Sequence, residues 1–386
     1  MKQNFEYPAM IAKPIISSIY TADPSGRVGD DGRMYLYCSH DCYPRGKNSL
    51  HDGIDEYHVF SSSDLVEWRD EGEILRSDDV EGGLHTGSFM WAPDCVYKNG
   101  KYYFYFPHPD REPWGENFQT WVAVSNSPAK DFKVLGYIKG VGGDGMIDPC
   151  VLIDDDGRNY LYYGGCGMPK GVELEDDMMT VKGEIHDLEG LYDYHEGPWV
   201  FKRSGIYYMT YPDNFYGVNR MAYAISENPL GPWTYKGFYL APTGSLTSHG
   251  SVVQMNGRWF CFYHNCAISG SGALRSVCVD ELFFNPDGTI VPVVQTNYAV
   301  EPAGPATPED PRAQSYSVSG QRLGGDAYLE GNAVVIAKEG DFIQFKKINS
   351  PNTCTCIITT SIKIMQCFRN HIIDGSHNKT INFNCH

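Results

Sequence analysis

The sequence contains no run of lysine and arginine long enough to follow a nucleic-acid backbone. It has 31 lysine and arginine residues against 48 aspartate and glutamate residues, and its formal net charge is −17 at pH 7. Because a strongly acidic chain repels a polyanion, this composition argues against nucleic acid as a partner. No apolar stretch approaches the length that crosses a bilayer, so we expect no membrane partner either.

A signal peptide and a zinc-finger pattern are also missing. The first ten residues, MKQNFEYPAM, lack the apolar core of a signal peptide, which leaves a cytoplasmic protein or a secreted protein given without its leader as the two expectations. The 12 cysteines include no paired C-x-x-C sites with zinc-finger spacing. Six of them stand in strand-like apolar surroundings, where we expect core packing: Cys38, Cys95, Cys150, Cys166, Cys261 and Cys278.

A tight glycine turn followed by an aromatic-rich strand occurs five times. The segments are DDGRMYLYCSHD, NGKYYFYFPHPD, DDGRNYLYYGGC, RSGIYYMTYPDN and NGRWFCFYHNCA, with turn glycines at Gly32, Gly100, Gly157, Gly205 and Gly257. The intervals of 48 to 68 residues fit a four-stranded propeller blade with loop insertions. Unrelated hairpins of a β-sandwich would not share turn, strand and upstream residue together. We therefore predict an all-β fold, a five-bladed β-propeller, over residues 1–300.

Five residues stand at nearly the same distance upstream of these turns. Counting back nine residues from each turn glycine, or eight in the last repeat, gives Asp23, Trp91, Asp148, Glu196 and His249. Each has an ordinary explanation alone, because Asp before Pro caps turns and a single His or Trp more often belongs to a core. Equivalent positions of radially arranged blades converge at one end of the channel, so the shared spacing predicts a functional pocket.

Five motifs surround these residues, in the chain order ADPS, FMWAPDCVYKNGKYYFYF, MIDPCVLIDDDG, HEGPWVFKRSGIYYMTYP and SHGSVVQMNGRWFCFYHN. Together they resemble the motifs of glycoside hydrolase family 43. The resemblance extends from about Tyr20 to about Val300, across all five repeats. It implies a five-bladed propeller that hydrolyses plant cell-wall glycans with inversion of configuration.

The resemblance also implies catalytic roles. Asp23 matches the general base of the family, Glu196 the general acid, and Asp148 the carboxylate that tunes and orients the acid. Inverting hydrolysis needs an acid and a base about 6.5–9.5 Å apart, a separation that different blades can provide. We expect burial under Trp91 and Phe89, together with a charged Asp148, to raise the pKa of Glu196.

Substrate and metal contacts are assigned to four residues. We expect Trp91 to stack on a sugar face beside Phe89, and Arg275 to bind a sugar hydroxyl or to hold Glu196. His249 matches a histidine that lies beside a calcium ion in many family members, so the resemblance implies Ca²⁺ as a cofactor. Because calcium prefers oxygen ligands, a largely water-filled shell is expected, with a sodium ion or a water cluster as alternatives.

The expected function is an exo-acting, inverting glycosidase that releases β-D-xylose and/or α-L-arabinofuranose from xylo-oligosaccharides or arabinoxylan. The insertions CSHDCYPRGKNSLHDGIDEYH and PHPDREPWGENFQTW would narrow the channel mouth, which favours exo over endo action. Three alternatives stay open: an endo-arabinanase of the same family, a non-catalytic carbohydrate-binding propeller, and a five-bladed retaining hydrolase of sucrose-like substrates. The last class carries its nucleophile in an NDPNG-like context, whereas Asp23 lies in ADPSG.

The composition changes after Val300. Residues 301–316 are proline-rich and are predicted to form a linker. Residues 317–386 are predicted to form a β-like extension, in which GDFIQFKKI is similar to the opening strands of a family 6 carbohydrate-binding module, here truncated. A module of this size has too small a core to be stable without further support.

Overall fold

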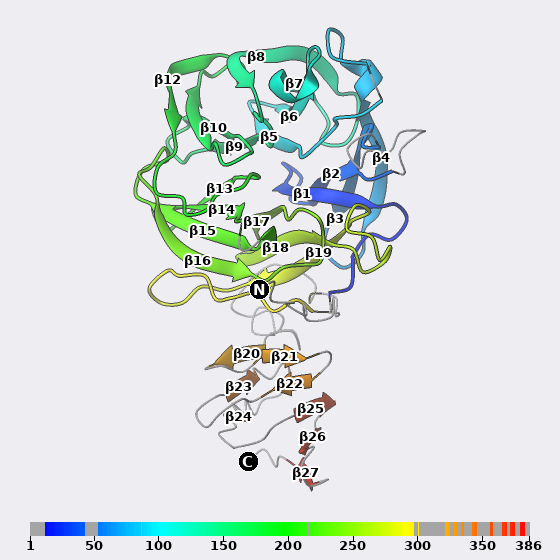
Figure 1. Cartoon of the computed structure of the whole chain (residues 1–386), viewed down its shortest axis with the longest axis vertical. Helices are drawn as coiled ribbons and strands as arrows, with labels where there is room; N and C mark the ends of the chain where they lie inside the picture. The colour runs from blue at the N-terminus through cyan, green and yellow to red at the C-terminus, as the bar shows by residue number, and fades with distance from the viewer. Residues whose placement is uncertain are drawn as a thin grey trace.

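Five antiparallel sheets surround one axis as the blades of a propeller (Figure 1). The computed structural model describes residues 12–42, 53–85, 87–214, 217–296 and 300, together with short strands between residues 321 and 382. In every blade, strands that are neighbours in the sheet are also consecutive in the sequence. The prediction of an all-β, five-bladed propeller is confirmed.

The first four blades have four strands each and the fifth has three. The strands of blades one to three are β1 (Thr21–Val28), β2 (Met34–His40), β3 (Glu56–Ser62), β4 (Arg69–Arg76), β5 (Asp94–Lys98), β6 (Lys101–Pro109), β7 (Phe118–Ser125), β8 (Lys133–Gly143), β9 (Cys150–Ile153), β10 (Asn159–Tyr163), β11 (Lys170–Leu174) and β12 (Val181–Asp187). Those of blades four and five are β13 (Trp199–Arg203), β14 (Ile206–Pro212), β15 (Met221–Ser226), β16 (Thr234–Leu240), β17 (Gly250–Met255), β18 (Arg258–Asn265) and β19 (Ser276–Leu282).

The five predicted turn glycines all lie between the first and second strands of their blades. Their φ angles are between 77° and 84°, a conformation that L side chains rarely adopt and that closes a tight hairpin. The first strands β1, β5, β9, β13 and β17 form the inner ring, each in contact with the first strand of the next blade, and β17 returns to β1. The ring is therefore closed, and the entrance to each first strand lies near the axis.

Residues ahead of β1 close the ring on the outside of the fifth blade. The amide of Ile15 donates a hydrogen bond of 2.8 Å to the carbonyl of Val277, and the amide of Thr21 donates one of 2.8 Å to the carbonyl of Arg275. Both acceptors lie on or next to β19, so the segment leading into β1 runs along the three-stranded fifth blade. This contact joins the two ends of the propeller and fixes Arg275 relative to β1.

Hydrophobic cores lie between neighbouring blades, which explains the abundance of tyrosine. Four buried clusters each combine residues from two adjacent blades, and a fifth joins the fourth and fifth blades and also includes Cys150 of the third. A buried tyrosine needs a partner for its hydroxyl, and Tyr37, Tyr105 and Tyr162 donate to carbonyls of the next blade at Pro128, Met178 and Pro229, over 2.7, 2.8 and 2.8 Å. Each of these bonds ties the second strand of one blade to the loop between the third and fourth strands of the next.

A buried ion pair connects the inner strands beneath the entrance. Arg27 on β1 donates to both carboxylate oxygens of Asp94 on β5, at 2.9 and 2.6 Å, and to the carbonyl of Val151 on β9, at 2.8 Å. Its guanidinium also lies 4.1 Å from the ring centre of Trp199 on β13. Four blades are thus joined through one arginine, which holds in place the strand entrances above it.

The cysteine prediction holds for five of six residues. Cys38, Cys95, Cys150, Cys261 and Cys278 are buried. Cys166 is exposed, which corrects the expectation of core packing. It lies beyond the end of β10 at Tyr163, in a loop where its φ is 54°, so it no longer follows the strand pattern that suggested burial.

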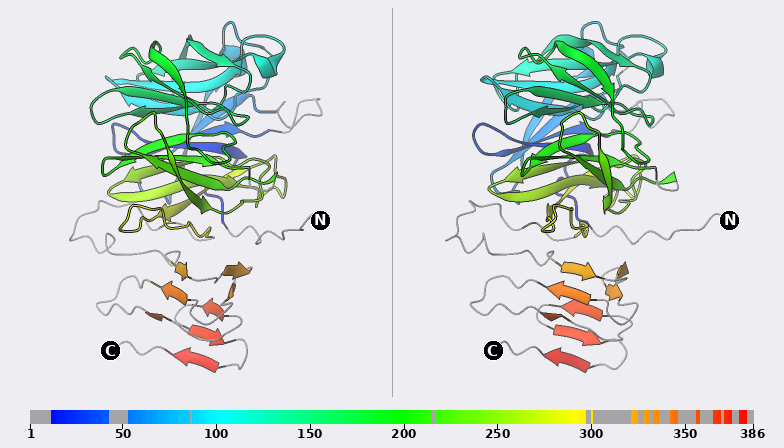
Figure 2. Two further views of the ribbon diagram at one scale, coloured as in Figure 1. Left: turned by 60° about the vertical axis from the view of Figure 1, so that its left-hand side comes forward. Right: turned by 90° about the vertical axis from the view of Figure 1, so that its left-hand side faces the viewer.

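Beyond the propeller, the chain forms two small sheets that are drawn apart from the blades in Figures 1 and 2. Their strands are β20 (Gln321–Gly324), β21 (Tyr328–Glu330), β22 (Ala333–Val335), β23 (Phe342–Phe345), β24 (Cys356–Ile357), β25 (Met365–Phe368), β26 (His371–Asp374) and β27 (Lys379–Asn382). The predicted linker 301–316 lies outside the described residues, and the similarity to a family 6 module stays a prediction. Within the described part of the chain, we find no helix with the length and apolarity needed to span a bilayer.

Candidate active site

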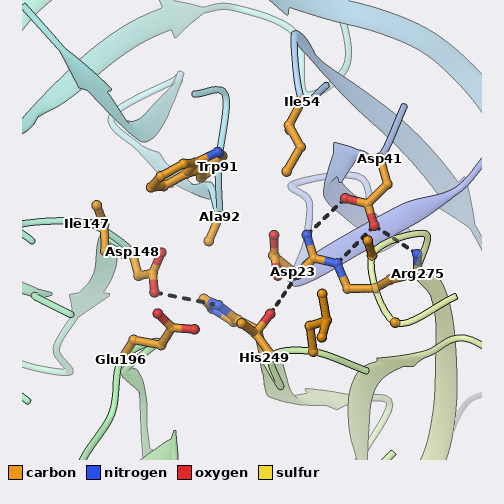
Figure 3. A pocket seen from close by; sticks show the side chains of 14 residues that line it. Asp23, Asp41, Ile54, Trp91, Ala92, Ile147, Asp148, Glu196, His249 and Arg275 are labelled. Carbon is orange, nitrogen blue, oxygen red and sulfur yellow. Dashed lines mark hydrogen bonds and ion pairs between the residues drawn. The ribbon is translucent and has the colours of Figure 1, made fainter. Parts of the chain in front are cut away.

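A single pocket collects the entrances of the inner strands at one end of the axis (Figure 3). Its lining residues are Asp23, Asp41, Ile54, Trp91, Ala92, Ile147, Asp148, Glu196, Leu246, Thr247, His249, Gly272, Ala273 and Arg275. Six of the seven predicted site residues are in this set, and Phe89 is not. The equal spacing in the sequence therefore corresponds to a common position in space, with one residue contributed by each blade.

Asp23 is held by contacts from three parts of the chain. Its Oδ2 accepts a hydrogen bond of 2.9 Å from the hydroxyl of Ser39 on β2, and its Oδ1 accepts one of 2.8 Å from Nη1 of Arg275. The backbone amide of Asp23 donates over 3.1 Å to Nδ1 of His264 on β18. Since Nδ1 is an acceptor, the proton of His264 lies on Nε2, which donates over 2.8 Å to the carbonyl of Thr247. Asp23 adopts φ of 52°, within an irregularity of the β1–β2 pairing.

Arg275 is bound by a second carboxylate, Asp41. Its Nε and Nη2 donate over 2.9 Å each to the two oxygens of Asp41, and its backbone amide donates to the same group over 2.8 Å. Planar two-point pairing of this kind fixes the guanidinium. The hydrogen bonds of Arg275 go to Asp23, Asp41 and Thr247, and its expected contact with a sugar hydroxyl or with Glu196 stays a prediction.

Asp148 and Glu196 form the opposite side of the pocket, where their carboxyl groups lie next to each other (Figure 3). The amide of Gly197 donates over 3.0 Å to Oδ2 of Asp148, so the residue after Glu196 positions Asp148. Gly197 has φ of 58°, and a Cβ there would lie 3.0 Å from Nδ1 of His249. The backbone angle and this close contact both favour glycine at position 197.

The pKa values of the carboxyl groups are shifted in opposite directions by their surroundings. Burial favours the neutral form of Asp23, but the charge of Arg275 and the hydrogen bond from Ser39, acting together with other nearby groups, outweigh burial and lower the pKa of Asp23. Burial raises the pKa of Glu196, and the charge on Asp23 raises it further. Burial and the charge of Glu196 raise the pKa of Asp148. The pocket therefore places the ionised carboxylate of Asp23 opposite a pair of carboxyl groups that retains a proton.

Trp91 and Phe89 occupy different places. Trp91 lines the pocket, and its backbone carbonyl accepts a hydrogen bond from the hydroxyl of Tyr57. Phe89 is 3% exposed and packs with its ring centre 5.6 Å from that of Trp91 and 5.1 Å from that of Trp114. The contact of Phe89 is with the aromatic residues beside the pocket, so it supports Trp91 from behind.

His249 lies on the axis, with Nδ1 4.0 Å from Oδ2 of Asp148. Burial lowers its pKa, which favours the neutral imidazole that a metal would need. Calcium takes about six to eight oxygen ligands, and among the described residues no three His, Cys, Asp or Glu side chains meet in a group that could hold a metal ion. The side chains of the described part of the pocket therefore do not fit a protein-built calcium cage.

Four contacts of the site were not found from the sequence. Asp41, Ser39 and His264 fix the carboxylate side of the pocket, and Leu246 lines its wall. None occupies the repeated position ahead of an inner strand. Asp41, in the segment HDC, and His264, in the segment YHN, both lie at the end of the second strand of a blade. This shared position can be recognised only when the strands of the blades are known.

Known proteins are similar to this chain in sequence and in structure. The xylosidase/arabinosidase 43A of Humicola insolens is 34% identical over 331 residues, covering 72% of this chain and 98% of its own length. The crystal structure of a β-xylosidase/α-arabinofuranosidase from a compost microbial metagenome, with xylotriose in a calcium-free form, matches with a TM-score of 0.66 and 33% identity, over 74% of this chain and 97% of that one. A Xanthomonas citri enzyme complexed with xylotriose matches with a TM-score of 0.67 and 32% identity, over 76% and 96%.

The family assignment follows from these matches and from the position of the motifs. The model of glycosyl hydrolases family 43 matches residues 11–290, a range that includes every strand of the five blades. The matched region contains every residue that lines the pocket. The chain belongs to glycosyl hydrolases family 43 and is a glycosidase.

Proposed function

We propose that the protein is an inverting, exo-acting glycosidase that releases β-D-xylose and/or α-L-arabinofuranose from xylan or arabinoxylan oligosaccharides. The observation that carries the proposal is the opposition of Asp23, whose pKa is lowered, and Glu196, whose pKa is raised, in one pocket. Carboxyl groups in opposite protonation states are what acid–base hydrolysis of a glycoside requires. A binding platform has no need of such a pair.

In the proposed reaction, Asp23 takes a proton from water as the water oxygen attacks the anomeric carbon. Glu196 gives its proton to the glycosidic oxygen as that bond breaks, so the leaving sugar departs as an alcohol. The two carboxyl groups exchange protonation states, and solvent restores them before the next cycle. Asp148 lies beside Glu196, and burial raises the pKa of both carboxyl groups, so the pair retains the proton that Glu196 donates. Arg275 keeps Asp23 ionised and oriented.

Trp91 and His249 complete the proposed sugar site. The indole of Trp91 provides an apolar face against which the C–H face of a sugar ring can stack. His249, uncharged because burial lowers its pKa, offers a hydrogen bond to a sugar hydroxyl without competing with Arg275 for the carboxylates. Phe89 supports the position of Trp91.

The proposed substrate class rests on similar proteins. The Humicola insolens protein and the compost metagenome enzyme are named for xylosidase and arabinosidase activity, and the compost and Xanthomonas citri enzymes were solved with xylotriose. We take the lining of the pocket, which includes the buried residues Ile54 and Ala92, to favour exo action. Of the two insertions expected to narrow the mouth, residues 43–52 of the first lie outside the described residues, and the second contains Trp114, which packs beside Trp91.

Calcium is proposed only as an ion beside His249 whose other ligands are water molecules. One similar structure is described as a calcium-free form, which supports calcium binding in some members of the family. No step above requires the ion. Dialysis against a chelator should lower the melting temperature or rate if calcium binds, and an unchanged melting temperature and rate would reject the ion.

The proposed function is tested by measuring release from p-nitrophenyl β-D-xylopyranoside, p-nitrophenyl α-L-arabinofuranoside and linear arabinan side by side. We expect turnover of one or both aryl glycosides and little of the arabinan. Proton NMR of the fresh product should show the inverted anomer. A retained anomer would support the sucrose-type alternative, rapid cleavage of arabinan the endo-arabinanase, and binding without release a carbohydrate-binding propeller.

A further inference from the structure

Leu246 differs from every other residue that lines the pocket. Its relative exposure is 61%, whereas the other lining residues, all within the described part of the chain, are buried or half-buried. A side chain that both borders the cavity and faces solvent lies at the mouth. An exposed leucine elsewhere on a surface needs no explanation, but one at the mouth of a polar pocket contacts whatever extends out of it.

The backbone of Leu246 is fixed on both sides. Its amide donates over 3.1 Å to the carbonyl of Gly272. A Cβ on Gly272 would lie 3.0 Å from Cγ and from the amide nitrogen of Leu246, so glycine permits this close approach. The next residue, Thr247, accepts a hydrogen bond of 3.0 Å from Arg275 and one of 2.8 Å from His264. The segment is therefore anchored to the same residues that hold Asp23.

The chemistry of the pocket determines what reaches the mouth. In the proposed reaction the sugar that is released occupies the buried part of the pocket, between Asp23 and Glu196. The remainder of the substrate is joined to the oxygen that Glu196 protonates, and its way out leads past the exposed rim. The C–H faces of a xylopyranose ring and an aromatic aglycone are both apolar, and either can pack against a leucine side chain.

We propose that Leu246 is a specificity-determining contact for the leaving group, the second sugar of a xylo-oligosaccharide. This inference rests on the proposed function. Leu246 touches no reacting atom, so it contributes binding energy only for substrates whose leaving group is large enough to reach it. The size of the leaving group, rather than the identity of the released sugar, decides whether Leu246 matters.

The test compares substrates that share the released sugar. For Leu246→Ala we expect kcat/KM for xylobiose to fall roughly tenfold, the low end of what a lost apolar contact costs in discrimination. With β-D-xylopyranosyl fluoride, whose leaving group is one atom, the change should stay within about twofold, since nothing reaches the mouth. Inhibition by free xylose should be unchanged, and Leu246→Met should restore the xylobiose value.

The matched control is Leu135→Ala on β8, which removes a leucine of 50% exposure outside the pocket and should affect neither substrate. Equal losses on xylobiose and the fluoride, or no loss on xylobiose, would overturn the role of Leu246 while leaving the proposed function intact. A wild-type protein that hydrolyses neither substrate would overturn the role of Leu246, and one that also fails to hydrolyse p-nitrophenyl α-L-arabinofuranoside would overturn the proposed function.

Discussion

The carboxylate of Asp23 accepts a hydrogen bond of 2.8 Å from the guanidinium of Arg275, 252 residues further along the chain. The same guanidinium is paired at two points with Asp41. One buried cation is thus shared by two carboxylates, of which only Asp23 faces Glu196 across the pocket. We infer that Asp41 anchors Arg275, and that Arg275 in turn keeps Asp23 charged and correctly oriented.

Replacing Arg275 should move the acidic limb of the pH profile. The charge of Arg275 lowers the pKa of Asp23 against the effect of burial. In Arg275→Ala that pKa rises, so Asp23 becomes protonated at a higher pH, and the acidic limb of kcat/KM should shift upward by about 1–3 pH units. The alkaline limb should move less. An unchanged acidic limb would contradict the proposed role of Arg275.

The control for this variant is Arg258→Ala, which also removes one positive charge. Arg258 is also paired with a carboxylate, Glu281, at 2.7 Å, but it lies on β18 away from the pocket lining. It should leave both limbs in place. A shift of similar size in both variants would indicate a general electrostatic effect rather than a local one.

Separate replacements of Asp23 and Ser39 should distinguish the contribution of the base from that of the hydrogen bond that orients it. Asp23→Asn keeps the shape of the side chain but cannot accept the proton of the attacking water, so turnover should fall by at least about 10²-fold on every substrate. Ser39→Ala removes the 2.9 Å hydrogen bond to Asp23 and leaves the carboxylate, so we expect a loss of roughly tenfold or less.

Steady-state rates and circular dichroism of both variants check this. Native-like spectra with activity above a few per cent in Asp23→Asn would remove Asp23 from the role of base. A loss in Ser39→Ala as large as that in Asp23→Asn would mean that the hydroxyl itself takes part in the reaction.

Buried neutral histidines should make the fold sensitive to acid. Burial lowers the pKa of His264 to about 3 and that of His108 to about 4. Below pH 6.5 the unfolded chain binds protons at these residues and the folded chain does not, so their effect is to reduce stability as pH falls from 6.5 toward the folded values. The effect of His40 on stability has the opposite sign, because its pKa in the folded protein is raised to about 10.

His108→Gln isolates one of these contributions, since His108 lies outside the pocket and its Nε2 is 3.2 Å from the carbonyl of Leu84, which an amide can also reach. The fall in melting temperature between pH 7 and pH 5 should be smaller in this variant than in the wild type. Equal falls in the two proteins would contradict a neutral buried His108.

The blades could be predicted from local sequence because each repeat forms its own hairpin. Gly32 and Gly157, at φ of 77° and 84°, are required by turns that involve only neighbouring residues. The same short-range geometry sets the spacing from each turn back to the strand entrance, which is why Asp148 and Glu196 could be placed in one pocket before the structure was known.

Contacts between distant segments could not be predicted in this way. The pair of Asp41 and Arg275 joins residues 234 apart, and Asp41 lies after β2 rather than ahead of an inner strand. Phe89 is two residues from Trp91, but the chain turns at Phe89, where φ is 72°, so its ring packs behind the pocket. Cys166 follows an aromatic strand and was expected to be buried, yet the strand ends three residues earlier.

The central claim, that Glu196 donates the proton, is tested most directly by the dependence of Glu196→Gln on the leaving group. Xylobiose needs full protonation of its leaving oxygen, whereas a dinitrophenyl β-xyloside leaves with little help. We predict a loss on the order of 10²–10⁴-fold with xylobiose, a far smaller loss with the dinitrophenyl glycoside, and disappearance of the alkaline limb. Glu184→Gln on β12 is the matched control and should change neither rate. Equal losses of Glu196→Gln on both substrates would contradict the account and direct the search for the acid to Asp148.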